Sequence, residues 1–593
     1  MNEPTRLFDC FEKLLKGSDS YTMMAAKENG SWKKYTPQEV LNIVNNLSAG
    51  LFQMGIGMGD NSPEGRDKVA VIAKNRPEWL MLDLAVQKIG AVLIPVYPTI
   101  NANELEFILK DASVKLIFVN DIHLFNKVNG IKANLPDLKE VYAFDKIDNI
   151  PHWMEILSLA NDDLIRQVKA IADEIKYEDL ATIIYTSGTT GTPKGVMLSH
   201  RNILSNVIDS MPCFPPGENM KALSFLPLNH IFERMVSYLY FFRGTSIYFA
   251  ESLEKIGDNL KEVQPQMFTT VPYLLEKVHE KIMQKGKELQ GIKRKLFFWA
   301  HDLATKFEIN KNRGFLYNMQ LSLANRLVFK KWREGLGGEI KYVISGGAAC
   351  QVRLIRIFTA AKIIVMEGYG LTETSPVISV NRYEEEGRMF GSVGPLIKNV
   401  QVKMAEDGEI LCKGPNVMMG YYKRPDLTAD SMEDGWYKTG DIGILIDNKF
   451  LIITDRKKEM FKTSGGKYVA PVVVENKVKE SPFVGNIMVT GAGEKYTGAL
   501  ITPSFNDLRQ WAKLNNIDYT TNEEMVKDRQ VVELYKTEIE RYNHQLNHVE
   551  QIKKFELLPY EWSVETGEMT PKLSLKRKVI MEKYKDAVRR IYA

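Results

Sequence analysis

A glycine- and hydroxyl-rich segment, residues 185–196, is the part of the sequence best suited to chemistry. It reads Tyr-Thr-Ser-Gly-Thr-Thr-Gly-Thr-Pro-Lys-Gly-Val. Its glycines let backbone N–H groups turn toward an anion, its hydroxyls can donate hydrogen bonds, and Lys194 adds a mobile positive charge. The pattern differs from the P-loop, which needs Gly-Lys followed by Ser or Thr. A flexible linker would not follow a strand-like run or interleave four hydroxyls with a lysine. The segment therefore predicts a phosphate-binding loop.

Six further short segments accompany this loop along the chain. They are residues 226–234 (LPLNHIFER), 345–348 (SGGA), 368–374 (GYGLTET), 436–441 (WYKTGD), 455–459 (DRKKE) and 567–572 (GEMTPK). In order and spacing, the seven segments resemble the signature of the AMP-forming acyl-CoA synthetases, a superfamily of adenylate-forming ligases. The 226–234 segment is similar to its long-chain fatty acid–CoA ligase branch. The resemblance covers nearly the whole chain.

The resemblance implies a reaction in two halves. A carboxylate attacks the α-phosphate of ATP to give an acyl-adenylate and pyrophosphate, and the thiol of CoA then displaces AMP. ATP and CoA are thus the implied co-substrates and Mg²⁺ the implied cofactor. Because anions meet in the first half, fixed donors and cations are expected to matter more than acid–base groups.

The same resemblance implies a set of nucleotide-binding residues. Tyr369 would lie against the adenine, Asp441 would accept both ribose hydroxyls, and Arg456 would contact the ribose from across a domain junction. The full set is Thr186, Ser187, Gly188, Thr189, Thr190, Gly191, Lys194, Gly346, Gly347, Ala348, Gly368, Tyr369, Gly370, Asp441 and Arg456.

The implied catalytic residues are Lys572, Thr372, Glu373, His230 and Lys462. Thr372 would bond the α-phosphate, and Glu373 would bind Mg²⁺, a hard cation that prefers oxygen ligands. His230 would lie by the acyl carboxylate, although a lone histidine is often a structural hydrogen-bonding residue.

Lys572 matches the lysine that bridges the carboxylate and the α-phosphate. Long-chain members commonly read Thr-Pro-Thr-x-Lys at this site, whereas this chain reads Thr-Pro-Lys-Leu-Ser over residues 570–574. Lys576 therefore remains the alternative.

The C-terminal part resembles the domain of this family that rotates between the two half-reactions. By position, Lys458 is the hinge candidate and Lys462 is expected to serve the second half. Gly465 and Gly466 would line the channel for the pantetheine arm of CoA, where side chains would obstruct the thiol.

Helical and strand-like segments alternate from residue 35 and must position these groups. The patterns predict helices at 36–53, 77–89 and 103–111 and strands at 69–72, 92–96, 115–119, 182–185 and 342–344. Such alternation indicates an α/β fold with a mostly parallel sheet. We expect a large N-terminal domain, residues 1–455, made of doubly wound βαβ subdomains and a small β-rich unit at 400–453. A smaller, mobile α+β domain, 456–593, follows, with a polar helix at 523–543.

Composition excludes several classes of protein. The 593 residues are 44% hydrophobic and 26% charged with a formal net charge of +4, which excludes a disordered chain and gives no support for nucleic acid as a partner. Cys10, Cys213, Cys350 and Cys412 form no CxxC pair, so free thiols in a reducing cytoplasm are expected. The N-terminus lacks the apolar stretch of a signal peptide. Any membrane contact would be peripheral, on the inner face.

Three features favour a long acyl chain. They are the 226–234 segment, the aromatic run at 235–242, and the helical segment from Lys277 to Arg333. Residues 277–334 hold 14 Lys or Arg against 5 Asp or Glu, which suits an anionic membrane surface. The alternatives are core packing for the aromatic run and a solvated face for the basic segment.

The sequence is also compatible with other functions. A fatty acyl-AMP ligase would pass its product to a carrier protein, but residues 458–466 contain no obvious blocking insertion, which favours CoA. A medium-chain or aryl acid ligase and a non-catalytic lipid- or nucleotide-binding protein are further alternatives. The sequence carries no signal for oligomeric state or chain-length preference.

Overall fold

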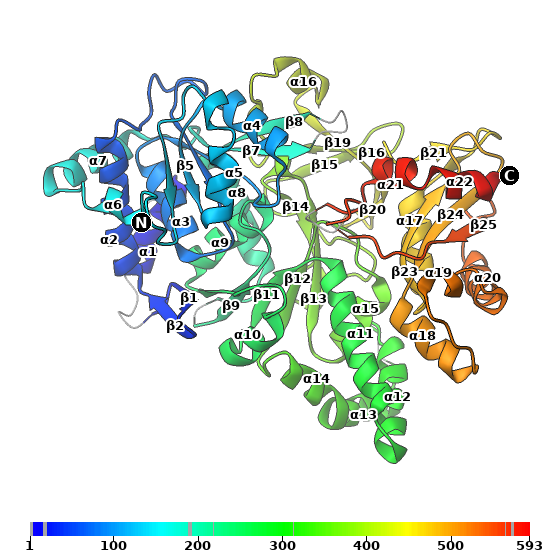
Figure 1. Cartoon of the computed structure of the whole chain (residues 1–593). Coiled ribbons are helices and arrows are strands. Elements are labelled where there is room, and N and C mark those ends of the chain that lie inside the picture. Colours follow the sequence, from blue (N-terminus) through cyan, green and yellow to red (C-terminus); the bar gives the residue numbers. More distant parts are fainter. Residues whose placement is uncertain are drawn as a thin grey trace.

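In the computed structural model, residues 4–15, 21–187, 192–217, 219–311, 313–563, 565–570 and 575–593 are described. Two large sheets with their helices make up most of the N-terminal part, a smaller strand-rich unit follows, and the C-terminal residues form a separate body (Figure 1). The expected α/β class is confirmed.

The first sheet has seven strands in the order β17-β8-β7-β4-β3-β5-β6. Alternate residues of β3 enter two different cores: Val69 and Val71 pack with α2 and α3, whereas Ala70 and Ile72 pack with α4 and α5. Helices thus cover both faces, as in a doubly wound sheet. The strands are β3 (Lys68–Ile72), β4 (Val92–Pro95), β5 (Val114–Val119), β6 (Glu140–Ala143), β7 (Leu180–Ser187), β8 (Pro193–Ser199) and β17 (Gly420–Tyr421). The helices include α2 (Pro37–Gln53), α3 (Pro77–Lys88), α4 (Ala102–Asp111), α5 (Ile122–Asn129) and α7 (Asp162–Glu174).

The second sheet has eight strands in the order β14-β13-β12-β11-β9-β10-β1-β2. From β12 to β10 every neighbouring pair is parallel, and β13 also runs parallel to β12. The strands are β1 (Met24–Glu28), β2 (Ser31–Tyr35), β9 (Lys221–Ser224), β10 (Ser246–Phe249), β11 (Met267–Thr270), β12 (Tyr342–Ser345), β13 (Ile364–Gly370) and β14 (Val377–Val380). Helices α8 (His200–Ser210), α9 (Ile231–Arg243), α10 (Ile256–Val263) and α15 (Val352–Ala360) belong to this unit.

A buried ionic network joins the two units. Arg234 of α9 and Asp83 of α3 are both fully buried, and the Arg234 Nε atom lies 2.8 Å from Asp83 Oδ2. The Tyr238 hydroxyl donates to the same carboxylate at 2.6 Å, and Arg234 also donates to the Thr182 hydroxyl on β7 at 2.7 Å. The network satisfies both charges away from water, which a buried pair requires.

An arm of helices projects from the second sheet between β11 and β12 (Figure 1). It consists of α11 (Pro272–Glu288), α12 (Gly291–Thr305), α13 (Phe315–Ala324), a π-helical segment at Asn325–Phe329 and α14 (Lys330–Gly335). The expected basic helical segment is therefore confirmed as helical. Within the described residues, no helix combines the length and the apolar composition needed to cross a bilayer.

The expected β-rich unit is a five-stranded antiparallel sheet. It contains β15 (Gln401–Met404), β16 (Glu409–Lys413), β18 (Met432–Glu433), β19 (Trp436–Ile446) and β20 (Phe450–Arg456). The predicted turns at 407–408 and 447–448 separate β15 from β16 and β19 from β20.

The C-terminal body packs helices on a three-stranded sheet, β23 (Val484–Thr490), β24 (Thr497–Pro503) and β25 (Ile552–Leu557). The short hairpin β21 (Phe461–Lys462) and β22 (Tyr468–Val469) precedes it. The helices are α17 (Pro471–Val478), α18 (Phe505–Leu514), α19 (Asn522–Met525), α20 (Arg529–Asn543), α21 (Arg577–Lys583) and α22 (Lys585–Tyr592).

Two expectations need correction. The single helix at 523–543 is wrong, because Asp528 interrupts it and caps α20 by accepting hydrogen bonds from the N–H groups of Gln530 and Val531. The aromatic run at 235–242 packs in the main core, where all of its side chains are buried, so the alternative of core packing holds. All four cysteines are free and buried, as expected.

Candidate functional site

The end of β13 and the turn after it carry five of the predicted residues, Gly368, Tyr369, Gly370, Thr372 and Glu373, and side chains from other segments hold the turn in place. Asn206 of α8 donates to the Val377 carbonyl at 2.7 Å and accepts from the Val377 N–H at 3.0 Å. Asn416 donates to the Thr374 carbonyl at 3.0 Å. At Gly370 an added Cβ would lie 1.7 Å from the Pro376 carbonyl oxygen, so only glycine fits there. The turn presents Tyr369, Thr372 and Glu373 in a fixed arrangement.

Three predicted ribose and adenine residues meet at Asp441. The Tyr369 hydroxyl donates to Asp441 Oδ2 at 2.7 Å, and Arg456 Nε lies 3.4 Å from Asp441 Oδ1. The Asp441 carboxyl is 6% exposed, and burial raises its pKa, while Arg456 and the Tyr369 hydroxyl act in the opposite direction. Because a carboxylate has about four acceptor positions, Asp441 keeps capacity for two ribose hydroxyls.

The phosphate side of the site is organised around Tyr421, which the sequence analysis missed. Its hydroxyl donates to Glu373 Oε1 at 3.0 Å, and Lys194 Nζ lies 5.3 Å from the centre of its ring. The strand β8 that carries Lys194 pairs with β17, which contains Tyr421, and this pairing brings the end of the predicted phosphate loop to Glu373. Gly188, Thr189, Thr190 and Gly191 lie outside the described residues. Thr186 and Ser187 end β7.

The 226–234 segment lies beside the 345–348 segment. A Cβ on Gly346 would lie 3.2 Å from the ring of Phe232, so glycine permits the close approach of α9 to the end of β12. Gly347 has a φ of +81°, which also favours glycine. Ala348 follows in the same loop.

His230 precedes α9 and caps it, because its Nδ1 accepts the Phe232 N–H at 3.1 Å. Burial raises the pKa of nearby Glu233 to about 7.

The junction between the N-terminal part and the C-terminal body lies at the predicted hinge. Lys457 is held to the strand-rich unit, since its amine pairs with Glu409 at 2.7 Å and its N–H donates to the Gly440 carbonyl at 2.9 Å. The Glu459 carboxylate pairs with Arg577 of the C-terminal body, whose Nε lies 3.2 Å away, while the Glu459 N–H donates to the Arg456 carbonyl at 2.9 Å. Lys458 is the residue between these two attachments.

The predicted second-half residues lie on the hairpin β21–β22. Lys462 extends its amine over the Tyr468 ring, 4.6 Å from the centre. Gly466 has a φ of +75° and needs glycine, whereas a Cβ on Gly465 would meet nothing closer than 3.9 Å. Open space around both glycines means that steric crowding in this arrangement does not explain them.

Backbone contacts join the two ends of the segment that carries the predicted catalytic lysine. Met569 and Leu575 form an isolated antiparallel bridge, and the Lys576 N–H donates to the Glu568 carbonyl at 2.7 Å. The Glu568 side chain is 1% exposed and accepts hydrogen bonds from Lys583 and Tyr584. Lys572 itself lies outside the described residues, and the alternative Lys576 is exposed.

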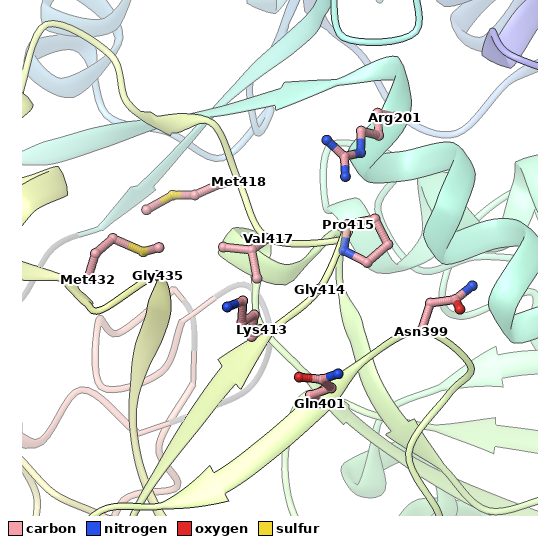
Figure 2. Close-up of a pocket in the computed structure, with 10 residues that line it drawn as sticks. All are labelled: Arg201, Asn399, Gln401, Lys413, Gly414, Pro415, Val417, Met418, Met432 and Gly435. Atoms are coloured by element: carbon pink, nitrogen blue, oxygen red, sulfur yellow. The ribbon is translucent and has the colours of Figure 1, made fainter.

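A hollow of about 450 Å³ lies next to the Glu373 turn, and none of the predicted site residues lines it. Figure 2 shows that Arg201 reaches it from α8 and Lys413 from β16. Its link to the site is Met418, whose N–H donates to the Glu373 carbonyl at 2.8 Å. The other lining residues are Asn399, Gln401, Gly414, Pro415, Val417, Met432 and Gly435.

Fold and site together define an adenylate-forming enzyme. A family model described as AMP-binding enzyme matches residues 15–422, and one described as AMP-binding enzyme C-terminal domain matches residues 459–593. The chain belongs to the AMP-binding enzyme family, in its long-chain fatty acid–CoA ligase branch.

Relatives and solved structures agree over almost the whole chain. The chain is 30% identical to the long-chain-fatty-acid–CoA ligase FadD15 of Mycobacterium tuberculosis, covering 95% of this chain and 93% of the relative. It is also 30% identical to human long-chain-fatty-acid–CoA ligase 1, covering 100% of this chain and 87% of the relative. The anthranilate CoA ligase AuaEII has a similar structure, with 16% identity, a TM-score of 0.73 and 98% of each chain covered. A Mycobacterium tuberculosis fatty acyl CoA synthetase matches with 21% identity and a TM-score of 0.63, covering 98% of this chain and 99% of that chain.

Proposed function

We propose that this chain activates a long-chain fatty acid with ATP through an acyl-adenylate and transfers the acyl group to CoA, releasing AMP and pyrophosphate. The observation that carries the adenylation is that two contact groups share the 368–374 segment: Glu373 with Tyr421 and Lys194, and Tyr369 with Asp441 and Arg456. The near-full-length relatives are named long-chain ligases, which favours CoA over a carrier protein and a long chain over an aryl acid.

The residues of the seven segments divide the first half-reaction between them. Asp441 and Arg456 bind the ribose, Tyr369 lies against the adenine, and Lys194 with the loop at 186–191 holds the phosphates. Thr372 donates to the α-phosphate, and Gly346, Gly347, Ala348, Gly368 and Gly370 allow the adenosine to approach the backbone. One oxygen of the fatty acid carboxylate then forms a bond to the α-phosphorus, and the bond to pyrophosphate breaks. His230 lies by the acyl carboxylate, and Lys572 bridges the two reacting anions.

Glu373 suits the Mg²⁺ that this chemistry implies. Among the described residues, no group of three or more His, Cys, Asp or Glu side chains is placed to hold a metal ion. A single carboxylate beside a phosphate-binding loop is nevertheless the usual protein contribution, because Mg²⁺ takes most of its other oxygens from phosphates and water. When bound there, Mg²⁺ would neutralise charge on the phosphates.

Glu373→Gln should raise the Mg²⁺ concentration needed for half-maximal adenylation by at least about tenfold, because a neutral amide replaces the anionic oxygen. The Gln side chain can still accept from the Tyr421 hydroxyl, so the turn is expected to keep its shape. ATP–pyrophosphate exchange measured across an Mg²⁺ titration gives the result. An unchanged midpoint would remove the metal role from Glu373.

We also propose that residues 456–593 form a mobile domain that turns about Lys458 after adenylation and brings Lys462, Gly465 and Gly466 to the adenylate. The side chains of Lys457 and Glu459 are attached to different bodies, which supports a pivot between them.

Lys458→Pro tests the pivot. Proline fixes φ near −65° and restricts the rotation, so the CoA step should fall by roughly tenfold or more while adenylation survives. Single-turnover assays measure adenylation and the CoA step separately. Lys457→Pro is not a suitable control, because it removes the N–H that bonds to Gly440, so Lys458→Ala serves instead. Equal loss of both half-reactions in the proline variant would contradict the pivot.

The proposed activity is tested with purified protein, palmitate, ATP, Mg²⁺ and CoA. We expect stoichiometric AMP and palmitoyl-CoA. Pyrophosphate with palmitoyl-adenylate, but without free AMP or thioester, would indicate an acyl-AMP ligase, and nucleotide binding without turnover would indicate a non-catalytic binder. The cytoplasmic location and a peripheral contact of Lys277–Arg333 with the inner membrane face are part of the same proposal, since long-chain acids partition into bilayers.

A further inference from the structure

A row of apolar side chains is exposed along α13. Phe315 is 84% exposed, Met319 52% and Leu323 48%, and the row continues to Leu327, 42% exposed, in the π-helical segment. The spacing of four residues places these side chains along one side of the helix, and Leu316, 62% exposed, widens the row at its start. Soluble proteins rarely expose such a continuous apolar surface unless something binds it.

The opposite side of α13 and of the π-helical segment packs against α12 and α14. The exposed row therefore faces away from these two helices. Ala324, Val328 and Phe329 are buried in a cluster with Phe297 and Trp332. The Tyr317 hydroxyl donates to the Leu303 carbonyl at 3.0 Å, which holds the start of α13 against the end of α12. Figure 1 shows α12 and α13 side by side at the far end of the arm.

Cations border the row, and two of them have acidic partners at its ends: Arg313 lies 3.8 Å from Glu308 and Lys330 lies 3.9 Å from Glu334. Residues 309–333 contain Lys311, Arg313, Arg326, Lys330, Lys331 and Arg333 and no Asp or Glu. At the start of α12, Ile292 is 84% exposed and is followed by exposed Lys293, Arg294 and Lys295. Trp332 lies 5.8 Å from Phe297 between ring centres, so this turn of α12 is near the end of the row.

Three other cations of the basic segment have acidic partners. Lys277 pairs with Glu280 at 2.9 Å and Lys306 pairs with Asp302. Lys287 pairs with Asp507 of the C-terminal body at 2.6 Å. Among the ion pairs of the described residues, none involves Lys311, Arg326, Lys331 or residues 293–295, so these cations keep their positive charge beside the apolar row.

We propose that α13 docks this chain on an anionic bilayer, with Phe315, Leu316, Met319, Leu323 and Leu327 in the interfacial layer and the surrounding lysines and arginines at the lipid headgroups. An apolar helix face bordered by cations matches an anionic bilayer, which has negative headgroups at its surface and apolar acyl chains beneath them. The inference deepens the proposed function, on which it rests for its purpose: a docked enzyme meets its substrate where long-chain acids dissolve.

The first test is sedimentation of the full chain with phosphatidylglycerol-containing vesicles and with pure phosphatidylcholine vesicles. Phe315→Gln/Leu316→Gln/Met319→Gln should reduce binding to anionic vesicles by roughly tenfold or more, since each buried apolar side chain contributes to partitioning. Lys293→Gln/Arg326→Gln/Lys331→Gln should weaken binding and flatten its salt dependence. Leu514→Gln, at an 84% exposed leucine on α18 outside the row, is the matched control and should bind like the wild type.

The second test measures insertion directly. All four native cysteines are buried, so Met319→Cys can be labelled selectively with an environment-sensitive fluorophore. We expect a blue shift and quenching by brominated lipids with anionic vesicles, and neither effect for Leu514→Cys. Identical spectra with and without vesicles would overturn the proposal.

Activity and oligomeric state separate the remaining outcomes. Turnover of octanoate, a water-soluble acid, should be equal in the apolar triple variant and the wild type, because the row contains no residue of the adenylate site. Inactive but vesicle-binding protein would contradict the proposed function and leave docking intact. If analytical ultracentrifugation shows a dimer that the triple variant converts to a monomer, with vesicle binding unchanged, the row is a contact between two copies and docking is overturned.

Discussion

Lys572→Ala is expected to slow formation of the acyl-adenylate about a hundredfold, or roughly 3 kcal/mol, while the CoA step with supplied acyl-adenylate stays near the wild-type rate. The reason is that the lysine bridges two anions only in the first half-reaction. The substitution leaves the base of the segment intact, because the Met569–Leu575 bridge and the Lys576–Glu568 hydrogen bond use backbone atoms. ATP–pyrophosphate exchange and single-turnover thioester formation measure the two halves.

Lys576→Ala is the matched control for this experiment. Its backbone N–H still donates to Glu568, and its side chain is exposed, so both half-reactions should remain within a fewfold of the wild type. If Lys576→Ala loses adenylation and Lys572→Ala retains it, the catalytic lysine is Lys576 and the long-chain spacing applies.

Asp83→Ala should lower the free energy of unfolding by about 3–5 kcal/mol, because it leaves the Arg234 guanidinium buried without its counter-ion. The Tyr238 hydroxyl also loses its acceptor, and the Gln87 amide loses one of its two acceptors. Urea denaturation monitored by tryptophan fluorescence gives the change in stability.

The paired variant Asp83→Leu/Arg234→Met separates loss of charge from loss of packing. Replacing both partners of a buried pair by apolar groups of similar size is often neutral or stabilising. We therefore expect the double variant to recover most of the stability that Asp83→Ala loses. A double variant as unstable as the single one would show that the network contributes through packing or hydrogen bonds and not through balanced charge.

The sequence predicted the elements where local signals agree with the final packing. The helix at 36–53 appears as α2 within one residue, because Thr36 caps it, Glu39 completes the capping box and Pro37 opens the first turn. The strands at 69–72, 92–96 and, after Lys115, 116–119 are buried on both sides, which their apolar runs indicate. The break before α20 also had a signal, since Asp528 is a good N-cap.

Long-range pairings could not be read from the sequence. Tyr421 reaches Glu373 only because β17 pairs with β8, two strands more than 200 residues apart in the chain. The Asp83–Arg234 pair joins α3 to α9 across the two sheets, and neither residue marks its partner in the sequence. The attachments of Lys457 to Glu409 and of Glu459 to Arg577 likewise join residues that lie far apart in the chain.

The central claim is that the fatty acid carboxylate attacks the α-phosphate of ATP. The most direct measurement uses palmitate labelled with a heavy oxygen isotope in both carboxylate oxygens, together with ATP, Mg²⁺ and CoA, and mass spectrometry of the products. When the thiol of CoA attacks the acyl carbon, the bond from that carbon to the bridging oxygen breaks, so AMP should carry one labelled oxygen and palmitoyl-CoA the other. Unlabelled AMP, or label in inorganic phosphate with ADP as the nucleotide product, would contradict the adenylate route.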